Sequence, residues 1–112
     1  MALMNVPPNT PRYLCSHLVR LLVFGPRATE QWANLEEIWC GGAVLECEEK
    51  IAGGALVKIS AGDVSFSGCV TAVEGHEFGW QVEITFSPLT PWTIERWRPE
   101  HALDPATLKG KL

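Results

Sequence analysis

Short runs in which apolar and polar positions alternate are the clearest pattern in the chain. Residues 43–49 and 80–86 each place apolar side chains at every second position, with glutamates or other polar residues between them. Residues 56–60 show the same pattern over a shorter length. Because successive side chains of a β-strand point to opposite faces, a period of two predicts half-buried strands in all three runs.

A fourth alternating run, residues 64–73, is longer and has a glycine inside it. Its apolar face is expected to hold Val64, Phe66, Gly68, Val70 and Ala72. Glycine weakens the interior of a strand, so its presence indicates a bend or bulge of the kind that small barrels need. Short turns are expected at residues 50–54, 61–63 and 74–77.

Two earlier segments have a less regular pattern. Residues 17–24, HLVRLLVF, predict a mostly buried strand that Gly25-Pro26 ends, although periodicity alone also allows a short helix. Residues 30–39, EQWANLEEIW, have a composition that favours helix. Their place before several strands instead favours a strand with a bulge near Glu36 and Glu37.

Paired glycines stand between two of the expected strands, in the stretch IWCGGAVL of residues 38–45. Glycine reaches positive φ without steric cost and admits close backbone approach. Gly41-Gly42 therefore predicts a tight reversal or a close approach that sets the register of the neighbouring strands.

The C-terminal part carries a helix signal. Thr90-Pro91 combines an N-cap residue with proline at the first helical position, and Pro99 would end a helix of about two turns. Five or six short strands joined by glycine-rich turns, followed by this helix, predict a mainly all-β chain. The spacing fits a small antiparallel barrel or sandwich.

Composition and charge narrow the class of protein. The 112 residues suit one domain, and 13 acidic against nine basic side chains argue against a general nucleic-acid-binding surface. No apolar run of ~20 residues and no signal-peptide pattern occurs, which predicts a cytoplasmic protein without membrane insertion. Three prolines in residues 1–11 predict a flexible N-terminal arm, and residues 106–112 form a C-terminal tail.

The four cysteines form no CxxC pair and have no histidine at zinc spacing, so we expect free thiols, no metal and no cofactor. A disulfide pair is the alternative. Cys15 and His17 would share one face of a strand, which permits a thiol–imidazole contact. Cys40 lies beside the glycine turn. A small thiol-dependent protein using Cys15 or Cys40 is therefore one functional hypothesis.

The order of these signals resembles the PilZ domain family. An arginine-bearing arm precedes the first strand, Gly-Ala opens an alternating strand, and the patterns G-x-x-V-x-I, F-S-G-x-V and G-x-x-V-x-I-x-F follow. The resemblance covers roughly residues 12–105. It implies a six-stranded antiparallel barrel with a short helix near the C-terminus.

Members of that family that bind cyclic di-GMP use an R-x-x-x-R arm and a [DN]-x-S-x-x-G motif. Arg12 matches the first arginine, but Ser16 stands at the second position. In the second motif Glu37 replaces Asp or Asn, Trp39 replaces serine, and only Gly42 is retained. Losing a bidentate arginine–phosphate contact costs on the order of 100-fold in affinity.

The resemblance therefore implies a non-enzymatic binding or signalling module whose cyclic di-GMP binding is weak or absent, and which acts through an unidentified protein partner. A cyclic di-GMP receptor with a non-standard site is the alternative. The candidate ligand-binding residues are Arg12, Ser16, Glu37, Trp39 and Gly42. Among the tryptophans, Trp80 and Trp97 are expected to pack in the core, and Trp39 to be an exposed functional ring.

Overall fold

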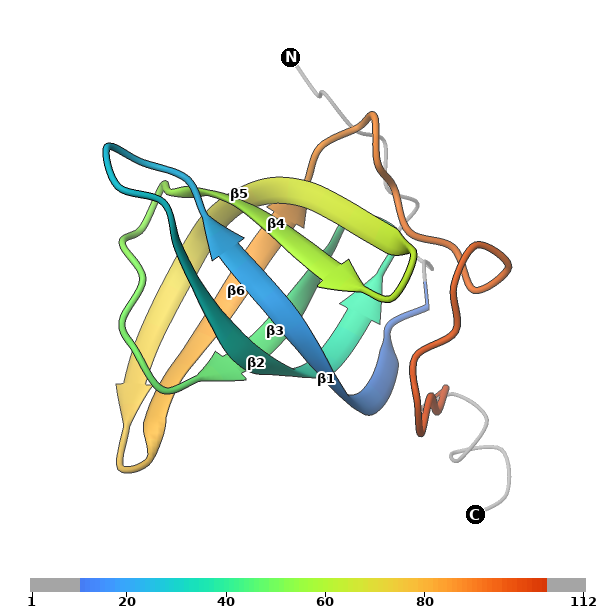
Figure 1. Cartoon of the computed structure of the whole chain (residues 1–112). Helices are drawn as coiled ribbons and strands as arrows, with labels where there is room; N and C mark the ends of the chain where they lie inside the picture. Colours follow the sequence, from blue (N-terminus) through green and yellow to red (C-terminus); the bar gives the residue numbers. More distant parts are fainter. Residues whose placement is uncertain (1–10, 105–112) are drawn as a thin grey trace.

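Six antiparallel strands form a closed barrel in the computed structural model, which describes residues 11–104 (Figure 1). The strands are β1 (Tyr13–Val23), β2 (Thr29–Trp39), β3 (Gly42–Cys47), β4 (Leu56–Ala61), β5 (Val64–His76) and β6 (Gly79–Phe86). The all-β barrel expected from the sequence is confirmed. The expected tail, and all but the last residue of the expected arm, lie outside the described residues.

The barrel consists of two three-stranded meanders, β1-β2-β3 and β4-β5-β6. They join where β3 pairs with β6 and where β1 pairs with β4, which gives the order β1-β2-β3-β6-β5-β4. The β1–β4 ladder is the shorter junction and covers only Arg20–Val23 of β1. The first half of β1 consequently has a free edge on that side, which the C-terminal segment covers.

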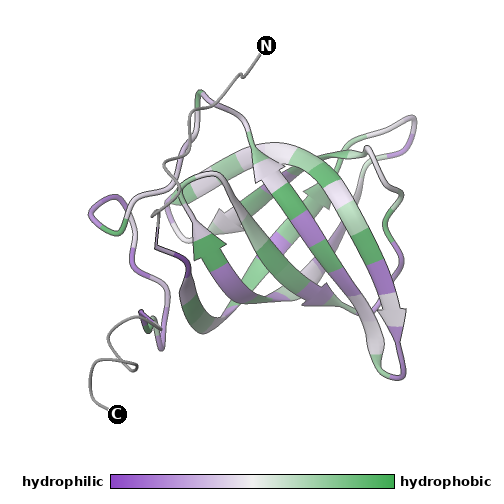
Figure 2. Cartoon of the chain, turned by 180° about the vertical axis from the view of Figure 1, so that it is seen from behind, coloured by the Kyte–Doolittle hydropathy of each residue, from purple (hydrophilic) through white to green (hydrophobic). Residues whose placement is uncertain are grey.

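Alternation along the strands fills the barrel interior with apolar side chains, and Figure 2 shows hydrophobic and hydrophilic positions alternating along the ribbons. The expected inward positions of β3, β4 and β6 are confirmed: Ala43, Leu45, Cys47, Val57, Ile59, Val82, Ile84 and Phe86 are all buried. None of the buried side chains among the described residues is polar or charged apart from the Cys47 thiol. Burial of this apolar surface is the main stabilising contribution to the fold.

Bulges shift the strand register in β2 and in β5. β2 is a strand, and its register with β3 shifts between Leu35 and Glu37, which confirms the predicted bulge. In β5 the register with β6 shifts between Val70 and Ala72, so the alternation reverses there. Ala72 was expected on the apolar face, and this expectation is wrong: Ala72 is exposed, and Val73 packs against the core in its place.

The glycine turn is a two-residue hairpin loop, Cys40-Gly41, between the paired residues Trp39 and Gly42. Neither glycine of the pair is among those with positive φ. The requirement at Gly42 is close approach, because a Cβ there would collide with the carbonyl oxygen of Ile84. The same holds for Gly68 against Thr85, so the expected bend in β5 is a site of tight contact with β6.

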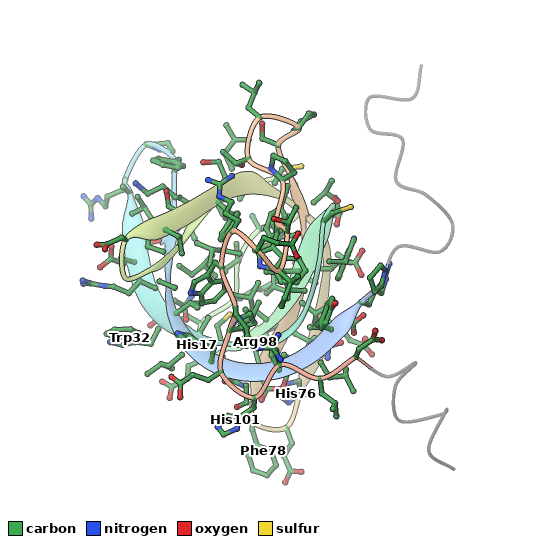
Figure 3. All side chains as sticks on the ribbon, turned by 90° about the vertical axis from the view of Figure 1, so that its right-hand side faces the viewer. His17, Trp32, His76, Phe78, Arg98 and His101 are labelled. Atoms are coloured by element: carbon green, nitrogen blue, oxygen red, sulfur yellow. The ribbon has the colours of Figure 1, made fainter. Side chains whose placement is uncertain are left out.

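The segment after β6 runs across one end of the barrel, which Figure 3 views directly. The helix expected within residues 90–99 is not formed: the amides of Arg96 and Trp97 donate to the carbonyl of Thr93, which makes a single turn. Trp92 is buried, and its indole N–H donates to the carbonyl of Trp97 at 2.8 Å. A two-turn helix is too short to be stable alone, so packing of these rings decides the conformation.

The same segment completes the free edge of β1. Leu14 and Leu103 exchange two backbone hydrogen bonds, and the amide of Ser16 donates to the carbonyl of Glu100. An uncovered edge strand is open to pairing with other chains, and here the C-terminal segment occupies it. Within residues 11–104 there is no helix with the length and apolar character needed to cross a membrane.

Candidate functional site

Four of the five candidate residues come together on the outside of the barrel, where the start of β1 meets the end of β2. The pairing of Tyr13 with Ile38 brings Arg12 next to Trp39. The Arg12 guanidinium carbon lies 3.9 Å from the centroid of the Trp39 ring. Its Nη1 lies 3.3 Å from Oε1 of Glu37. We call Arg12, Glu37, Trp39 and Gly42 the motif cluster.

The backbone beneath the motif cluster is held firmly. The carbonyl of Cys40 accepts a hydrogen bond from the amide of Trp92, and the carbonyl of Gly41 accepts one from Phe86. These bonds fix the β2–β3 turn to the end of β6 and to the C-terminal segment. The turn is therefore a rigid support for Trp39 and Gly42.

Trp39 is buried, with 8% of its surface exposed, so its expected role as an exposed functional ring is wrong. Its neighbour Ile38 belongs to the barrel core, whereas Trp39 is not part of that core. The indole instead packs against Gly42, where an added Cβ would lie 2.9 Å from the ring atom Cζ2. Arg12 covers the ring from outside. Trp80 and Trp97 pack against the core as predicted.

Ser16, the fifth candidate, has other partners. It lies in the β1 bulge between Leu14 and His17, and its Oγ donates to Oδ1 of Asn34 at 3.4 Å. Ser16 is therefore not part of the motif cluster. One guanidinium remains, already engaged by a carboxylate and an indole.

The motif cluster offers a limited chemistry. Just over half of the Arg12 side chain surface, 54%, is exposed, so an anion can reach it. A phosphate at this position would share the guanidinium with the carboxylate of Glu37, which would repel it, and the space over Gly42 is filled by the indole. The cluster is thus a closed contact between side chains of the chain itself.

The thiol–imidazole pair suggested by the sequence is not formed. The Cys15 Sγ–H donates to the carbonyl of Leu35, while Nδ1 of His17 accepts from the amide of Glu100. Burial, with a smaller effect of the carboxylates of Glu36 and Glu37, raises the pKa of Cys15 to about 12. A thiol is nucleophilic only as the thiolate, so Cys15 is unsuited to nucleophilic chemistry. All four cysteines are free, as predicted.

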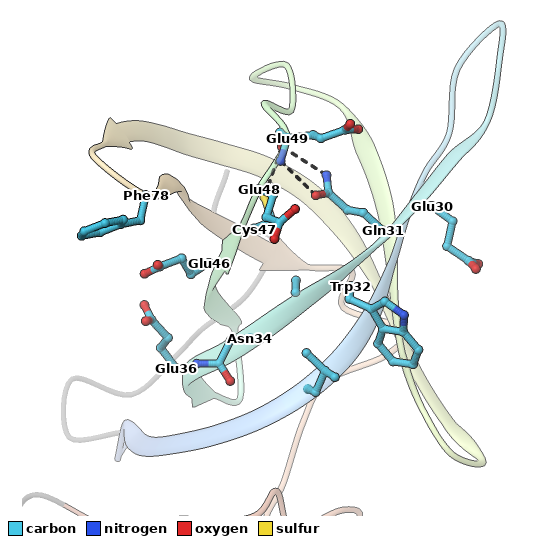
Figure 4. A pocket seen from close by; sticks show the side chains of 12 residues that line it. Glu30, Gln31, Trp32, Asn34, Glu36, Glu46, Cys47, Glu48, Glu49 and Phe78 are labelled. Atoms are coloured by element: carbon cyan, nitrogen blue, oxygen red, sulfur yellow. Dashed lines mark hydrogen bonds between the residues drawn. The ribbon is translucent and has the colours of Figure 1, made fainter.

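A second feature is a groove of about 620 Å³ on the outer face of β2 and β3 (Figure 4). The paired core residues Ala33 and Cys47 are among the residues that line it. Five glutamates line it and no Lys or Arg does. We call it the acidic groove; its lining is Leu18, Glu30, Gln31, Trp32, Ala33, Asn34, Glu36, Glu46, Cys47, Glu48, Glu49 and Phe78.

Two carboxylates converge in the acidic groove. Glu36 and Glu46 face each other in Figure 4, and the amide of Gln81 donates to Glu36. Burial is the main cause that raises the pKa of Glu36, and the carboxylate of Glu46 raises it further, against the opposing effects of Gln81 and His76. His76 Nε2 lies 3.5 Å from Glu46. These contacts leave the groove with an excess of negative charge.

The sequence did not identify the acidic groove. Glu36 and Glu46 are polar positions of expected strands, and both lie on the outer face of β2 and β3, whereas Glu48 follows the end of β3. Glu36 follows Asn34 on the outer face of β2, and Asn34 pairs with Glu46 of β3, so the pairing of these two strands brings the carboxylates together. Trp32 and Phe78, 57% and 79% exposed, also line the groove, and their exposure is known only from the structure.

Among the described residues, no group of three or more His, Cys, Asp or Glu side chains is arranged to hold a metal ion. Comparison of the chain with protein-family models and with curated protein sequences finds no match.

Proposed function

We propose that the chain is a non-enzymatic, PilZ-like binding module that has lost cyclic di-GMP binding and acts through protein contacts. The observation that carries this proposal is the closed motif cluster, in which Arg12 lies on a buried Trp39 and pairs with Glu37. These are the positions that the family resemblance assigns to the ligand. Here they bind each other.

Glu37 and a nucleotide phosphate would compete for the same guanidinium. A phosphate that engages Arg12 gains one charge-assisted contact but has to share the guanidinium with Glu37, whose carboxylate repels it. It also finds Ser16 at the position of the second arginine. Where the family motif has two arginines to hold the phosphates, this chain has only Arg12, which already contacts Glu37 and Trp39. This supports the loss of cyclic di-GMP binding.

The direct test is calorimetric titration of the chain with cyclic di-GMP, alongside Arg12→Ala and the control Arg27→Ala. Arg27 is an exposed arginine in the β1–β2 turn. We expect no heat of binding in the micromolar range. Micromolar binding that disappears in Arg12→Ala and persists in Arg27→Ala would instead establish the alternative, a receptor with a non-standard site.

A gain-of-binding variant tests the family assignment itself. The triple substitution Ser16→Arg, Glu37→Asp and Trp39→Ser restores the motif residues and removes the ring above Gly42. If the variant folds by circular dichroism, we expect it to bind cyclic di-GMP. A folded variant without binding would count against the resemblance as the explanation of the motif cluster.

A further inference from the structure

The acidic groove has the features of a docking surface. Trp32 and Phe78 lie at opposite sides of it, and carboxylates lie between them (Figure 4). Leu18, 59% exposed, adds a third apolar side chain. Exposed aromatic side chains that surround a hollow are typical anchors in protein interfaces. Exposed glutamates alone are ordinary on a protein surface. Their grouping in a groove beside exposed aromatic side chains is what indicates a binding surface.

Most of the negative charge in the acidic groove lacks a cationic partner within the described residues. Glu30 pairs with Arg20, and Glu46 lies beside the imidazole of His76. Glu36, Glu48 and Glu49 form no ion pair with a Lys or Arg of residues 11–104. Complementary charge would therefore have to come from a binding partner.

We propose that the acidic groove binds a basic peptide segment of a partner protein, in which lysine or arginine residues alternate with apolar side chains. The cations would meet Glu36, Glu46 and Glu48, and the apolar side chains would pack on Trp32 and Phe78. This rests on the proposed function, an interaction module, and names the surface and the partner chemistry.

Other occupants fit less well. A nucleic acid would be repelled by the five carboxylates. A second copy of the chain carries a net charge of −4 and has no cluster of basic residues in its sequence. A metal ion would leave Trp32 and Phe78 unused. The segment 105–112 carries Lys109 and Lys111 with two leucines, and it enters the test as a competing occupant.

The test is fluorescence anisotropy of a dye-labelled peptide in which lysines alternate with leucines. We expect the full chain to bind it, and binding to weaken between about 0.1 M and 1 M salt as screening shortens the Debye length from about 10 Å to 3 Å. The double variant Glu36→Gln/Glu46→Gln should weaken binding about tenfold. The matched control Asp63→Asn/Glu95→Gln, with the same change in net charge, should not.

Apolar anchoring is tested separately. Phe78→Ala should lower the affinity about tenfold or more, whereas Leu89→Ala, which truncates another highly exposed apolar side chain outside the groove, should leave it unchanged. A peptide with serines in place of the leucines should bind weakly. Equal binding of the serine peptide, or equal loss in both charge variants, would overturn the proposal in favour of diffuse electrostatic attraction.

Three further results would also overturn it. The first is absence of binding by the full chain. The second is binding about tenfold tighter in Lys109→Gln/Lys111→Gln, which would make the chain's own C-terminal segment the occupant. The third is self-association that Phe78→Ala abolishes, which would make a second copy the occupant. Nucleotide binding at Arg12 would refute the proposed function without altering the peptide result, so the two failures are distinguishable.

Discussion

The guanidinium of Arg12 lies 3.9 Å from the ring centroid of Trp39, and this contact covers a tryptophan on the outside of the barrel. Trp39 would otherwise present a large apolar ring beside the β2–β3 turn. Its burial stabilises the end of β2, and the guanidinium is held there by the ring and by Glu37 together. Arg12 is therefore a structural residue of the motif cluster.

Replacing Arg12 by alanine should destabilise the chain by about 1 kcal/mol, because it removes a cation–π contact and an exposed ion pair. Urea unfolding measures this change. Arg27→Ala, which removes an exposed arginine of the β1–β2 turn, should stay within about 0.5 kcal/mol of the parent. Equal stability of the two variants would show that the Arg12 contact contributes nothing.

Replacing Gly42 by alanine should destabilise the chain by about 1–3 kcal/mol, since the new Cβ collides with the carbonyl of Ile84 and with the Trp39 ring. Gly53→Ala is the control, because a Cβ at Gly53 meets no atom within 4 Å. Thermal unfolding followed by circular dichroism compares the two. A Gly42→Ala chain as stable as Gly53→Ala would refute the close approach.

The Cys15 thiol should resist alkylation in the folded chain. Burial raises its pKa to about 12, and burial is also the first cause of the raised pKa of Cys47. Both should stay unmodified by iodoacetamide at about pH 8, where free cysteine reacts readily, and react after unfolding in guanidinium. Mass spectrometry of the digested chain locates the label. Rapid labelling of native Cys15 would revive the thiol-dependent hypothesis.

The raised pKa of Glu36 has a defined sign for stability. A carboxyl group whose pKa is higher in the folded than in the unfolded chain stabilises the fold at low pH, and this contribution is lost as the pH rises through the folded value. The groups around it are Glu46, His76 and Gln81, with the Cys15 thiol also near. This contribution to stability therefore begins to be lost above about pH 4.5, which is the ordinary pKa of a glutamate side chain.

Glu36→Gln removes this titration. The variant should become more stable than the parent as the pH rises above that value, by less than about 1 kcal/mol because the site is partly exposed. The difference in free energy of unfolding between the variant and the parent should shrink towards acidic pH. Urea unfolding across the pH range, with Glu95→Gln as a control, measures this. A parent chain that gains stability over Glu36→Gln with rising pH would contradict the assignment.

The sequence by itself determined the alternating strands β3, β4 and β6 and their inward residues, because the period of two is a local property of each strand. It also located the close approach at the glycine pair, which follows from the steric freedom of glycine. The strand β2 and its bulge were inferred from the place of residues 30–39 before several strands, against a composition that favours helix.

Only the tertiary structure decided the rest, because it depends on register between strands distant in the sequence. The bulge at residues 70–72 moved Ala72 outward. Packing of Trp92 and Trp97 on the barrel end replaced the expected helix with one turn. The pairing of β1 with β2 brought Arg12 onto Trp39, and the pairing of β2 with β3 gathered Glu36 and Glu46 in one groove. Local propensity contains no information on such cross-strand neighbours, whose positions follow from the closed sheet.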